Sequence, residues 1–172
     1  MGPLMELFDA IDTRSSAGRL TAPGPSPEQI DRLLRAAERA PDHGRIRPWR
    51  FIVLEGAARE AFATAAAAAK RIRLPLLTEE QLAAERDKIL RSPSIVVAAC
   101  VADRANTKVP EIEQVIAVGA AVENLFLAAH GLGYGVMWKT GAAAYDPAVK
   151  ALLGLQPRDH IVAILHLGTR LK

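Results

Sequence analysis

Three short stretches carry the guanidinium, ammonium and hydroxyl groups with which this chain could bind an anion. The first is a polar turn that contains Arg14, Ser15 and Ser16. Arginine and hydroxyl groups suit a phosphate dianion, since each charge-assisted hydrogen bond contributes roughly 1.5–3 kcal/mol. Taken alone, this composition is more typical of a solvated turn, so the stretch predicts a phosphate site only in combination with the other two.

The second and third stretches place further cationic groups next to predicted strands. Arg39 and His43 flank Pro41, where an amphipathic helix ends, and Lys139 and Thr140 follow a short apolar strand. A cofactor that brings its own reactivity and a phosphate tail fits such a set, because a nearby cation stabilises the anionic edge of a reduced flavin. The residues therefore favour a flavin over other anions. A basic helix-to-strand connector around Pro41 is the alternative that the same residues allow.

The sequence contains no other recognisable catalytic or metal-binding pattern. A nucleophile elbow, a His-Glu-x-x-His helix and a Walker loop are all missing. His130 and His166 lie on apolar stretches that are typical of core or interface histidines, whereas a polar loop exposes His43. Cys100, the single cysteine, falls in an apolar run and is expected to be a buried, unreactive thiol. We therefore expect no metal site, and we expect a cofactor to carry the chemistry without a catalytic side chain.

Composition and length indicate one soluble domain that spans residues 1–172. The net charge of +3 and the pI of about 9.3 favour an anionic partner, but an aromatic content of 5% is too low for a nucleic-acid stacking surface. No apolar run is expected to reach the length that crosses a bilayer, and the N-terminus lacks a signal-peptide pattern. We therefore expect a cytoplasmic protein without nucleic-acid or membrane partners.

Periodicity and capping residues predict an α+β fold without the regular strand–helix alternation of a parallel sheet. Ser26 and Thr78 each begin a capping box, and Asp146 caps a short helix. The glycines between 131 and 135 follow a helix and precede a strand, which is the reverse of a dinucleotide-binding fingerprint. Helices are predicted over residues 4–11, 26–40, 57–73, 78–92, 111–130 and 147–153, and strands over 49–54, 94–102, 136–138 and 160–167.

The helix predicted over residues 111–130 is the most apolar element. Glu111 and Glu113 suit the positive end of a helix, which is a simpler explanation for the pair than acid–base catalysis. From 115 to 129 the sequence is apolar almost all round, so we expect a buried central helix whose small residues could admit a second subunit. The predicted N-terminal helix also has an apolar face, formed by Leu4, Leu7, Phe8 and Ile11.

An ordered series of short motifs covers nearly the whole chain. They are residues 14–20, 39–43 with Pro48-Trp49, 108–110 with 113–114, 133–135 leading to 138–141, and 167–169. In this order they resemble the nitroreductase family, in particular its small NAD(P)H nitroreductases. The resemblance implies a nitroreductase-like α+β fold, with a central, mostly antiparallel sheet of about four to five strands flanked by helices. It also implies a homodimer with FMN bound at the subunit interface.

The resemblance implies roles for particular residues. Arg14, Ser15 and Ser16 would hold the ribityl phosphate, and Arg39 and His43 would contact the flavin. The flavin pocket would be completed by Trp138, Lys139 and Thr140. A segment matching the family's nicotinamide nucleotide site comprises Ala128, Ala129, His130, Gly131, Leu132 and Gly133.

The sequence departs from the family pattern at two of these positions. Ser15 stands where the family usually has a second arginine, so one cationic phosphate contact is missing, and Arg19 or Arg170 is the expected substitute. Lys139 stands where the family usually has an arginine, and an ammonium is a point charge without a planar fork.

The function that these expectations favour is FMN-dependent oxidation of NADH or NADPH. Hydride would pass through the flavin to a nitroaromatic, a quinone or a related small-molecule acceptor in a ping-pong cycle. Two alternatives stay open. One keeps the fold but uses the flavin for fragmentation or reductive dehalogenation, and the other is a non-catalytic module that binds a nucleotide or another anion.

Overall fold

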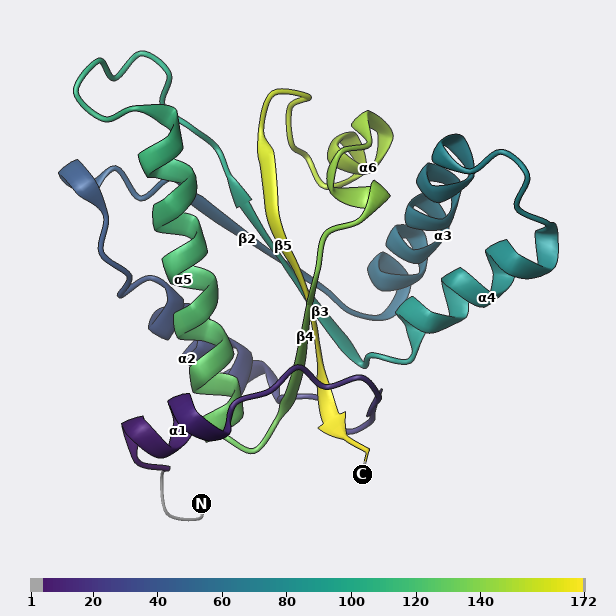
Figure 1. The fold of residues 1–172 in the computed structure, drawn as a ribbon, viewed down its shortest axis with the longest axis horizontal. Coiled ribbons are helices and arrows are strands. Elements are labelled where there is room, and N and C mark those ends of the chain that lie inside the picture. Colours follow the sequence, from purple (N-terminus) through teal and green to yellow (C-terminus); the bar gives the residue numbers. More distant parts are fainter. Residues whose placement is uncertain (1–4, 172) are drawn as a thin grey trace.

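The computed structural model describes residues 5–171 and has a central sheet with helices on both sides (Figure 1). The strands are β1 (Leu20–Thr21), β2 (Trp49–Leu54), β3 (Ser94–Cys100), β4 (Gly135–Lys139) and β5 (His160–Arg170). The helices are α1 (Leu7–Thr13), α2 (Pro27–Ala37), α3 (Gly56–Arg73), α4 (Glu79–Leu90), α5 (Glu111–Gly131) and α6 (Pro147–Leu152), with 3-10 turns η1 (His43–Arg45) and η2 (Ala142–Ala144).

β5 organises the sheet because it pairs with three other strands. The strand order is β1-β5-β3-β2, β4 also pairs with β5, and every pairing is antiparallel. The predicted α+β class and antiparallel sheet are thus confirmed. Two details differ from the prediction: β1 was not expected, and β5 continues beyond Leu167 to Arg170, where it pairs with β1.

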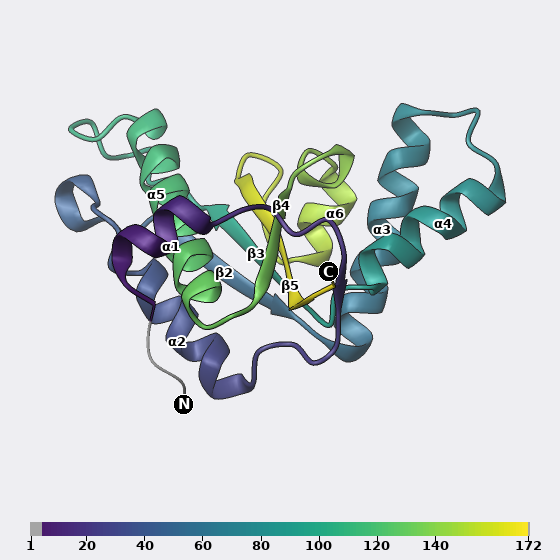
Figure 2. The same ribbon diagram turned by 60° about the horizontal axis from the view of Figure 1, so that its bottom comes forward.

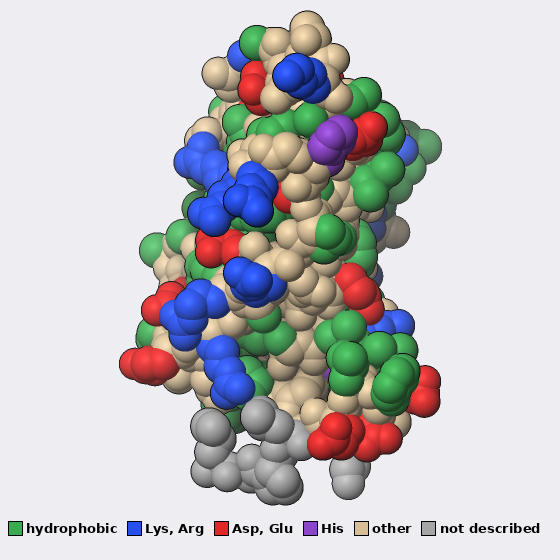
Figure 3. Space-filling view, turned by 90° about the vertical axis from the view of Figure 1, so that its left-hand side faces the viewer, with side chains coloured by type: hydrophobic (Ala, Val, Ile, Leu, Met, Phe, Trp, Pro, Cys, Tyr) green, Lys and Arg blue, Asp and Glu red, His purple; other side chains and the backbone are tan. Residues whose placement is uncertain are grey.

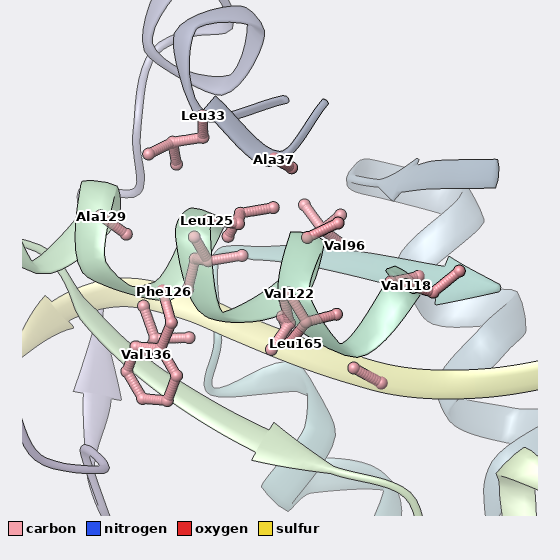
Figure 4. Close-up of a cluster of buried hydrophobic side chains, with 14 of the residues drawn as sticks. Leu33, Ala37, Val96, Val118, Val122, Leu125, Phe126, Ala129, Val136 and Leu165 are labelled. Atoms are coloured by element: carbon pink, nitrogen blue, oxygen red, sulfur yellow. The ribbon is translucent and has the colours of Figure 1, made fainter. Parts of the chain in front are cut away.

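Alternation along the strands separates the core into two layers. Val96, Val136 and Leu165 face α2 and α5, and Figure 4 shows their side chains in one cluster with the α5 residues Leu125 and Phe126. Neighbouring strand residues, among them Ile95, Val97 and Ile164, face the opposite layer of α3, α6 and η2. Successive side chains of a strand point to opposite faces, so a residue's position in β4 or β5 decides which helical layer it meets.

The predicted helix starts are confirmed by their hydrogen bonds. Ser26 and Thr78 each form a complete capping box with a glutamine three residues later, at α2 and α4 respectively. The Asp146 side chain accepts hydrogen bonds from two backbone N–H groups of α6. These caps satisfy donors that the first helical turn leaves unpaired, which is why they could be recognised locally.

The apolar face predicted for the N-terminal helix is largely exposed to solvent. In α1 the side chains of Leu7, Phe8 and Ile11 are 62%, 76% and 47% exposed, and only Ala10 is buried. Leu4, the first residue of that predicted face, lies outside the described residues. The reason is the place of α1, which lies across the end of α5 away from the sheet (Figure 2).

The long helix α5 is central, but it is not buried all round. Ile112 and Ile116 are each 63% exposed, while Val118, Val122 and Leu125 are fully buried. Contrary to expectation, α5 is long and apolar enough to cross a membrane by length and composition alone. In the most apolar 18-residue stretch of α5, 44% is buried inside the fold. The core helix of a soluble protein can have the same length and apolar composition.

Candidate functional site

The loop after α1 is held across β4 by backbone pairing. Ala17 N–H donates to the Val136 carbonyl oxygen at 2.8 Å, and the chain then enters β1 beside the end of β5 (Figure 2). The crossing is close: a Cβ at Gly135 would lie 2.7 Å from a Leu20 methyl group and 2.9 Å from the Ala17 Cβ. Glycine at 135 therefore allows the loop that carries the predicted phosphate residues to lie directly on the sheet.

Within this loop, Ser15 is bound to the C-terminal strand and Ser16 is exposed. Arg170 Nη2 donates to the Ser15 carbonyl oxygen at 2.6 Å and to its hydroxyl oxygen at 2.9 Å. Of the two expected substitutes for a second arginine, Arg170 therefore contacts Ser15 directly. Arg19, the other expected substitute, lies on the wall of a neighbouring cavity.

Arg14 faces α5. Its Nε lies 3.7 Å from Glu123 Oε1, and its guanidinium lies 4.7 Å from the centre of the Phe126 ring. Nearby, His130 Nε2 is 2.9 Å from the Thr13 hydroxyl. The pKa of His130 lies below its usual value because of burial first, and then because of the positive charges of Arg170 and Arg14.

Two adjoining cavities form a groove on the α3–α4 side of the sheet, which we call the cationic groove. The larger, of about 410 Å³, lies between α3, α4, the end of β4 and η2, and the smaller, of about 250 Å³, extends to the loop before β1. Lys88, Lys139 and His166 belong to the walls of both cavities. Thr140 and apolar side chains, among them Phe62, Ala66, Ile89 and Ile164, line the larger cavity, and Gly18, Arg19, Arg91 and Ser92 line the smaller.

The groove carries an excess of positive charge. Glu85 is its one acidic wall residue, and Lys70 and Lys88 each lie 2.7 Å from a Glu85 carboxylate oxygen. These two hydrogen bonds hold the pKa of Glu85 below its usual value. The pKa of Lys139 is also lowered, mainly by burial. Lys139 and the arginines on the groove's rim are therefore left to attract an anion.

Arg39 and His43 lie elsewhere, on the α2–α5 side. Arg39 lines a third cavity, of about 420 Å³, together with Arg45, Arg47 and Trp49. His43 Nδ1 is 2.6 Å from Glu113 Oε2 at the start of α5. Figure 3 shows basic side chains gathered along one edge of the face to which α5 belongs. This third cavity shares no wall residue with the cationic groove, so within one chain the predicted flavin residues form two separate groups.

The two neighbours Trp138 and Lys139 point to opposite faces of β4. Lys139 lines the cationic groove, whereas the Trp138 indole Nε1 donates to the Val162 carbonyl oxygen at 3.1 Å and the ring is 37% exposed. Only Lys139 and Thr140 of the three predicted pocket residues therefore reach this groove.

The predicted nicotinamide segment, residues 128–133, forms the C-terminal turn of α5 and the residues after it. Ala129 is fully buried and its carbonyl oxygen accepts a hydrogen bond from Tyr134 N–H, while Gly133 is exposed with φ +86°. A ligand could reach only the outer residues of this turn. A nicotinamide nucleotide site here stays a prediction.

Comparison with known proteins decides the family. The model of the nitroreductase family matches residues 11–169, nearly the whole chain. The chain belongs to the nitroreductase family. It is 37% identical to a protein of Escherichia coli (strain K12) named "Putative NAD(P)H nitroreductase YdjA", covering 96% of this chain and 88% of that one.

Solved structures agree with this assignment. A nitroreductase-like family protein from Bacillus cereus superposes with a TM-score of 0.82 at 27% identity, covering 100% of this chain and 89% of that chain. A Desulfovibrio desulfuricans protein whose structure is a complex with FMN superposes with a TM-score of 0.75 at 25% identity, covering 99% of this chain and 89% of that one.

In this nitroreductase-family chain, sequence reasoning missed the contribution of α3 and α4. Neither helix carried a predicted site residue, yet Lys70 and Arg73 of α3 and Lys88 of α4 line the cationic groove. The one local signal was their spacing, since basic residues three apart lie on the same side of a helix. That spacing is equally typical of a solvated face, so only the packing of α3 and α4 beside β4 identifies these residues.

Proposed function

We propose that this chain is an FMN-dependent NAD(P)H oxidoreductase that functions as a homodimer. Hydride passes from NADH or NADPH to the bound flavin and from there to a nitroaromatic, a quinone or a related small-molecule acceptor, in a ping-pong cycle. The single observation that carries the proposal is the cationic groove next to the contact between Ser15 and Arg170.

The groove fits the chemistry of FMN. FMN joins a phosphate dianion to a flat ring system that takes up negative charge when it is reduced. The groove combines the guanidinium of Arg19, on the loop before β1, at its smaller end with cations and apolar side chains at its larger end. The D. desulfuricans relative, which was solved with FMN, supports the same assignment.

The N-terminal loop and the end of β5 would hold the phosphate. Ser15, Ser16 and Arg170 provide two hydroxyl groups and one guanidinium, and Arg19 lines the adjoining cavity. Arg14 is the remaining candidate, and a phosphate must compete with its ion pair to Glu123. That pair is 3.7 Å long and partly exposed, so it is worth no more than about 1 kcal/mol.

The groove's cations and apolar walls would act on the ring. When bound, the flavin supplies the hydride acceptor and donor, so the chain needs no nucleophile of its own. Lys88, Lys139 and Thr140 provide the polar contacts. The ammonium of Lys139, on the wall of both cavities, would attract negative charge on the ring. The apolar side chains of Phe62 and Ile164 form part of the wall against which the ring would lie.

A homodimer would reconcile the two separate groups of predicted flavin residues. Arg39 and His43 lie on the side of the sheet opposite the cationic groove, so they cannot join it within one chain. A second copy would supply its own Arg39 and His43, and the exposed apolar residues Phe8, Ile112 and Ile116 are the surface that we assign to contact between the copies. Exposed apolar side chains gathered on one face are typical of a protein–protein interface.

Two further parts of the proposal concern the reductant and the compartment. Residues 128–133 would contact NADH or NADPH through the exposed side of their turn. Cys100 is fully buried and burial raises its pKa to about 11, which suits an unreactive thiol in a cytoplasmic protein.

The proposed activity is tested by following NADH and NADPH oxidation with FMN-loaded protein, first with oxygen and then with a nitroaromatic or a quinone. Lys139→Ala should lower kcat/KM by at least about tenfold, the effect of losing one charge-assisted contact. Arg71→Ala is the matched control, because Arg71 pairs with Glu79 and lines none of the three cavities.

The outcomes separate the alternative functions. Oxidation of NAD(P)H coupled to loss of the acceptor supports the proposal. Reduced FMN that leaves nitroaromatics and quinones unchanged would favour another flavin reaction on the same fold. Absence of any NAD(P)H oxidation by FMN-loaded protein would contradict both and favour a non-catalytic anion-binding module.

A further inference from the structure

His166 is a buried imidazole at the place where the two cavities of the cationic groove meet. It lies on β5 between Ile95 of β3 and Met137 of β4, and it is 3% exposed. Its side chain lines both cavities, as do those of Lys88 and Lys139. A ligand that extends from the N-terminal loop to the α3–α4 layer must therefore pass over this imidazole.

The Ser92 hydroxyl determines which nitrogen of His166 carries the proton. Ser92 Oγ lies 2.9 Å from His166 Nδ1, and both residues are buried. Within residues 5–171 neither group has another hydrogen bond. If Nδ1 carried the proton, the hydroxyl would accept it and its own O–H would lack an acceptor. Buried donors are nearly always paired, so the hydroxyl donates to Nδ1 and the proton resides on Nε2.

His166 Nε2–H is reached from the groove. Among the described residues, the one fully buried side-chain nitrogen or oxygen without a partner is Arg59 Nε. Within residues 5–171 His166 Nε2 also has no partner, yet it is not among the fully buried atoms, so this nitrogen is not sealed in the core and faces the cavities that its side chain lines. The groove therefore has a neutral imidazole donor in a wall that Lys88 and Lys139 also line.

The imidazole stays neutral at physiological pH. Burial, and then the positive charge of Lys139, lower the pKa of His166 to about 4. A neutral imidazole with a fixed tautomer is a directional donor, unlike a solvated lysine.

We propose that His166 is a positioning residue for the flavin, whose Nε2–H donates a hydrogen bond to an acceptor atom of the ring bound in the groove. The inference rests on the proposed function, because it needs a flavin there. The ring's nitrogen and carbonyl acceptors gain negative charge on reduction, so this bond strengthens in the reduced state. His166 thus favours reduced over oxidised FMN, in addition to orienting the ring.

The test compares His166→Leu, which removes the donor, with His166→Gln, whose amide can donate from a similar place. Wild type, both variants and the Arg71→Ala control are titrated with FMN, and the midpoint potential of each complex is measured. His166→Leu should bind oxidised FMN about fivefold more weakly, the effect of one lost neutral hydrogen bond, and His166→Gln should recover most of the affinity. If the affinity of His166→Leu for reduced FMN falls by a further factor of ten, the midpoint potential of its complex falls by about 30 mV.

Histidine ¹⁵N NMR of the wild type adds a measurement that needs no variant. Free protein should show His166 protonated at Nε2, and added FMN should shift that signal and protect its proton from exchange. If wild type binds FMN but His166→Leu has the same affinity and potential, or the Nε2 signal does not respond, the inference is overturned while the proposed function stands. If wild type does not bind FMN, the proposed function fails and the inference fails with it.

Discussion

Arg170 donates two hydrogen bonds to Ser15, one to its carbonyl oxygen at 2.6 Å and one to its hydroxyl at 2.9 Å. Ser15 follows the first helix and Arg170 ends the last strand, so this contact joins the two ends of the described chain at one point. A guanidinium that is already fixed by a carbonyl oxygen has lost much of its freedom before any ligand binds. We infer that it binds an anion at lower entropic cost than a free side chain would.

Replacing Arg170 should therefore weaken FMN binding. Arg170→Ala removes one cation from the loop and leaves the Ser15 carbonyl unpaired, so we expect a 10- to 100-fold rise in the FMN Kd, measured by fluorescence quenching. Arg170→Lys should recover part of the loss, because it restores the charge without the planar fork. An unchanged Kd for Arg170→Ala would show that the phosphate lies elsewhere.

Glycine at position 168 should be required for the junction of β5 with the N-terminal loop. A Cβ there would lie 2.8 Å from the Thr21 carbonyl oxygen and 2.7 Å from Pro93 Cδ, and the backbone oxygen cannot rotate away. Gly168→Ala should lower the free energy of unfolding by about 1–3 kcal/mol, measured in urea. Gly131→Ala is the control: a Cβ meets nothing within 4 Å, and alanine favours the helix. Equal stability of the two variants would contradict the close approach.

His166 should make the protein less stable as the pH falls from about 6.5 to about 4. Its pKa is lowered from 6.5 to about 4 in the folded chain, so between these values the unfolded chain binds a proton that the folded chain does not. Stability therefore rises with pH across this window, by about 2–3 kcal/mol for one such group. Urea unfolding at several pH values should show this slope in wild type and a smaller one in His166→Leu. Identical slopes would contradict a buried neutral imidazole.

The exposed residue Ile116 should contribute to the dimer. It is 63% exposed on α5, and a charge there would be unpaired in a tight interface. Ile116→Asp should turn a dimer into a monomer in sedimentation experiments and raise the FMN Kd with it. Glu60→Ala, a change of one exposed charge on α3, should leave the dimer intact. A wild-type monomer at micromolar concentration would remove the homodimer from the proposal.

Local chemistry explains which parts of the fold could be predicted from the sequence. The capping boxes at Ser26 and Thr78 are satisfied within four residues, so their hydrogen bonds are visible in the sequence itself. β1 could not be recognised, because a strand of two residues shows no alternation and its partners Thr169 and Arg170 lie at the far end of the chain. The exposure of Phe8 could not be predicted either, because it depends on where α1 packs against the rest of the chain.

The sequence predicted those residues of the candidate site that lie in short motifs. Arg14, Ser15 and Lys139 were found from residue type and family resemblance. Lys88 and His166 were not, because the first is one of many helical lysines and the second occupies an apolar strand. Only the pairing of β5 with β3 and β4, and the packing of α4 beside them, brings these two residues to one groove.

The central claim, that the groove binds FMN, is tested most directly by titrating the purified protein with FMN while following flavin fluorescence, the visible spectrum and the melting temperature. The account predicts saturable quenching at one FMN per chain, a yellow protein that releases FMN on heating, and stabilisation of about 2.7 kcal/mol at 100 times the Kd. A colourless protein, with neither saturable quenching nor a higher melting temperature in excess FMN, would contradict it.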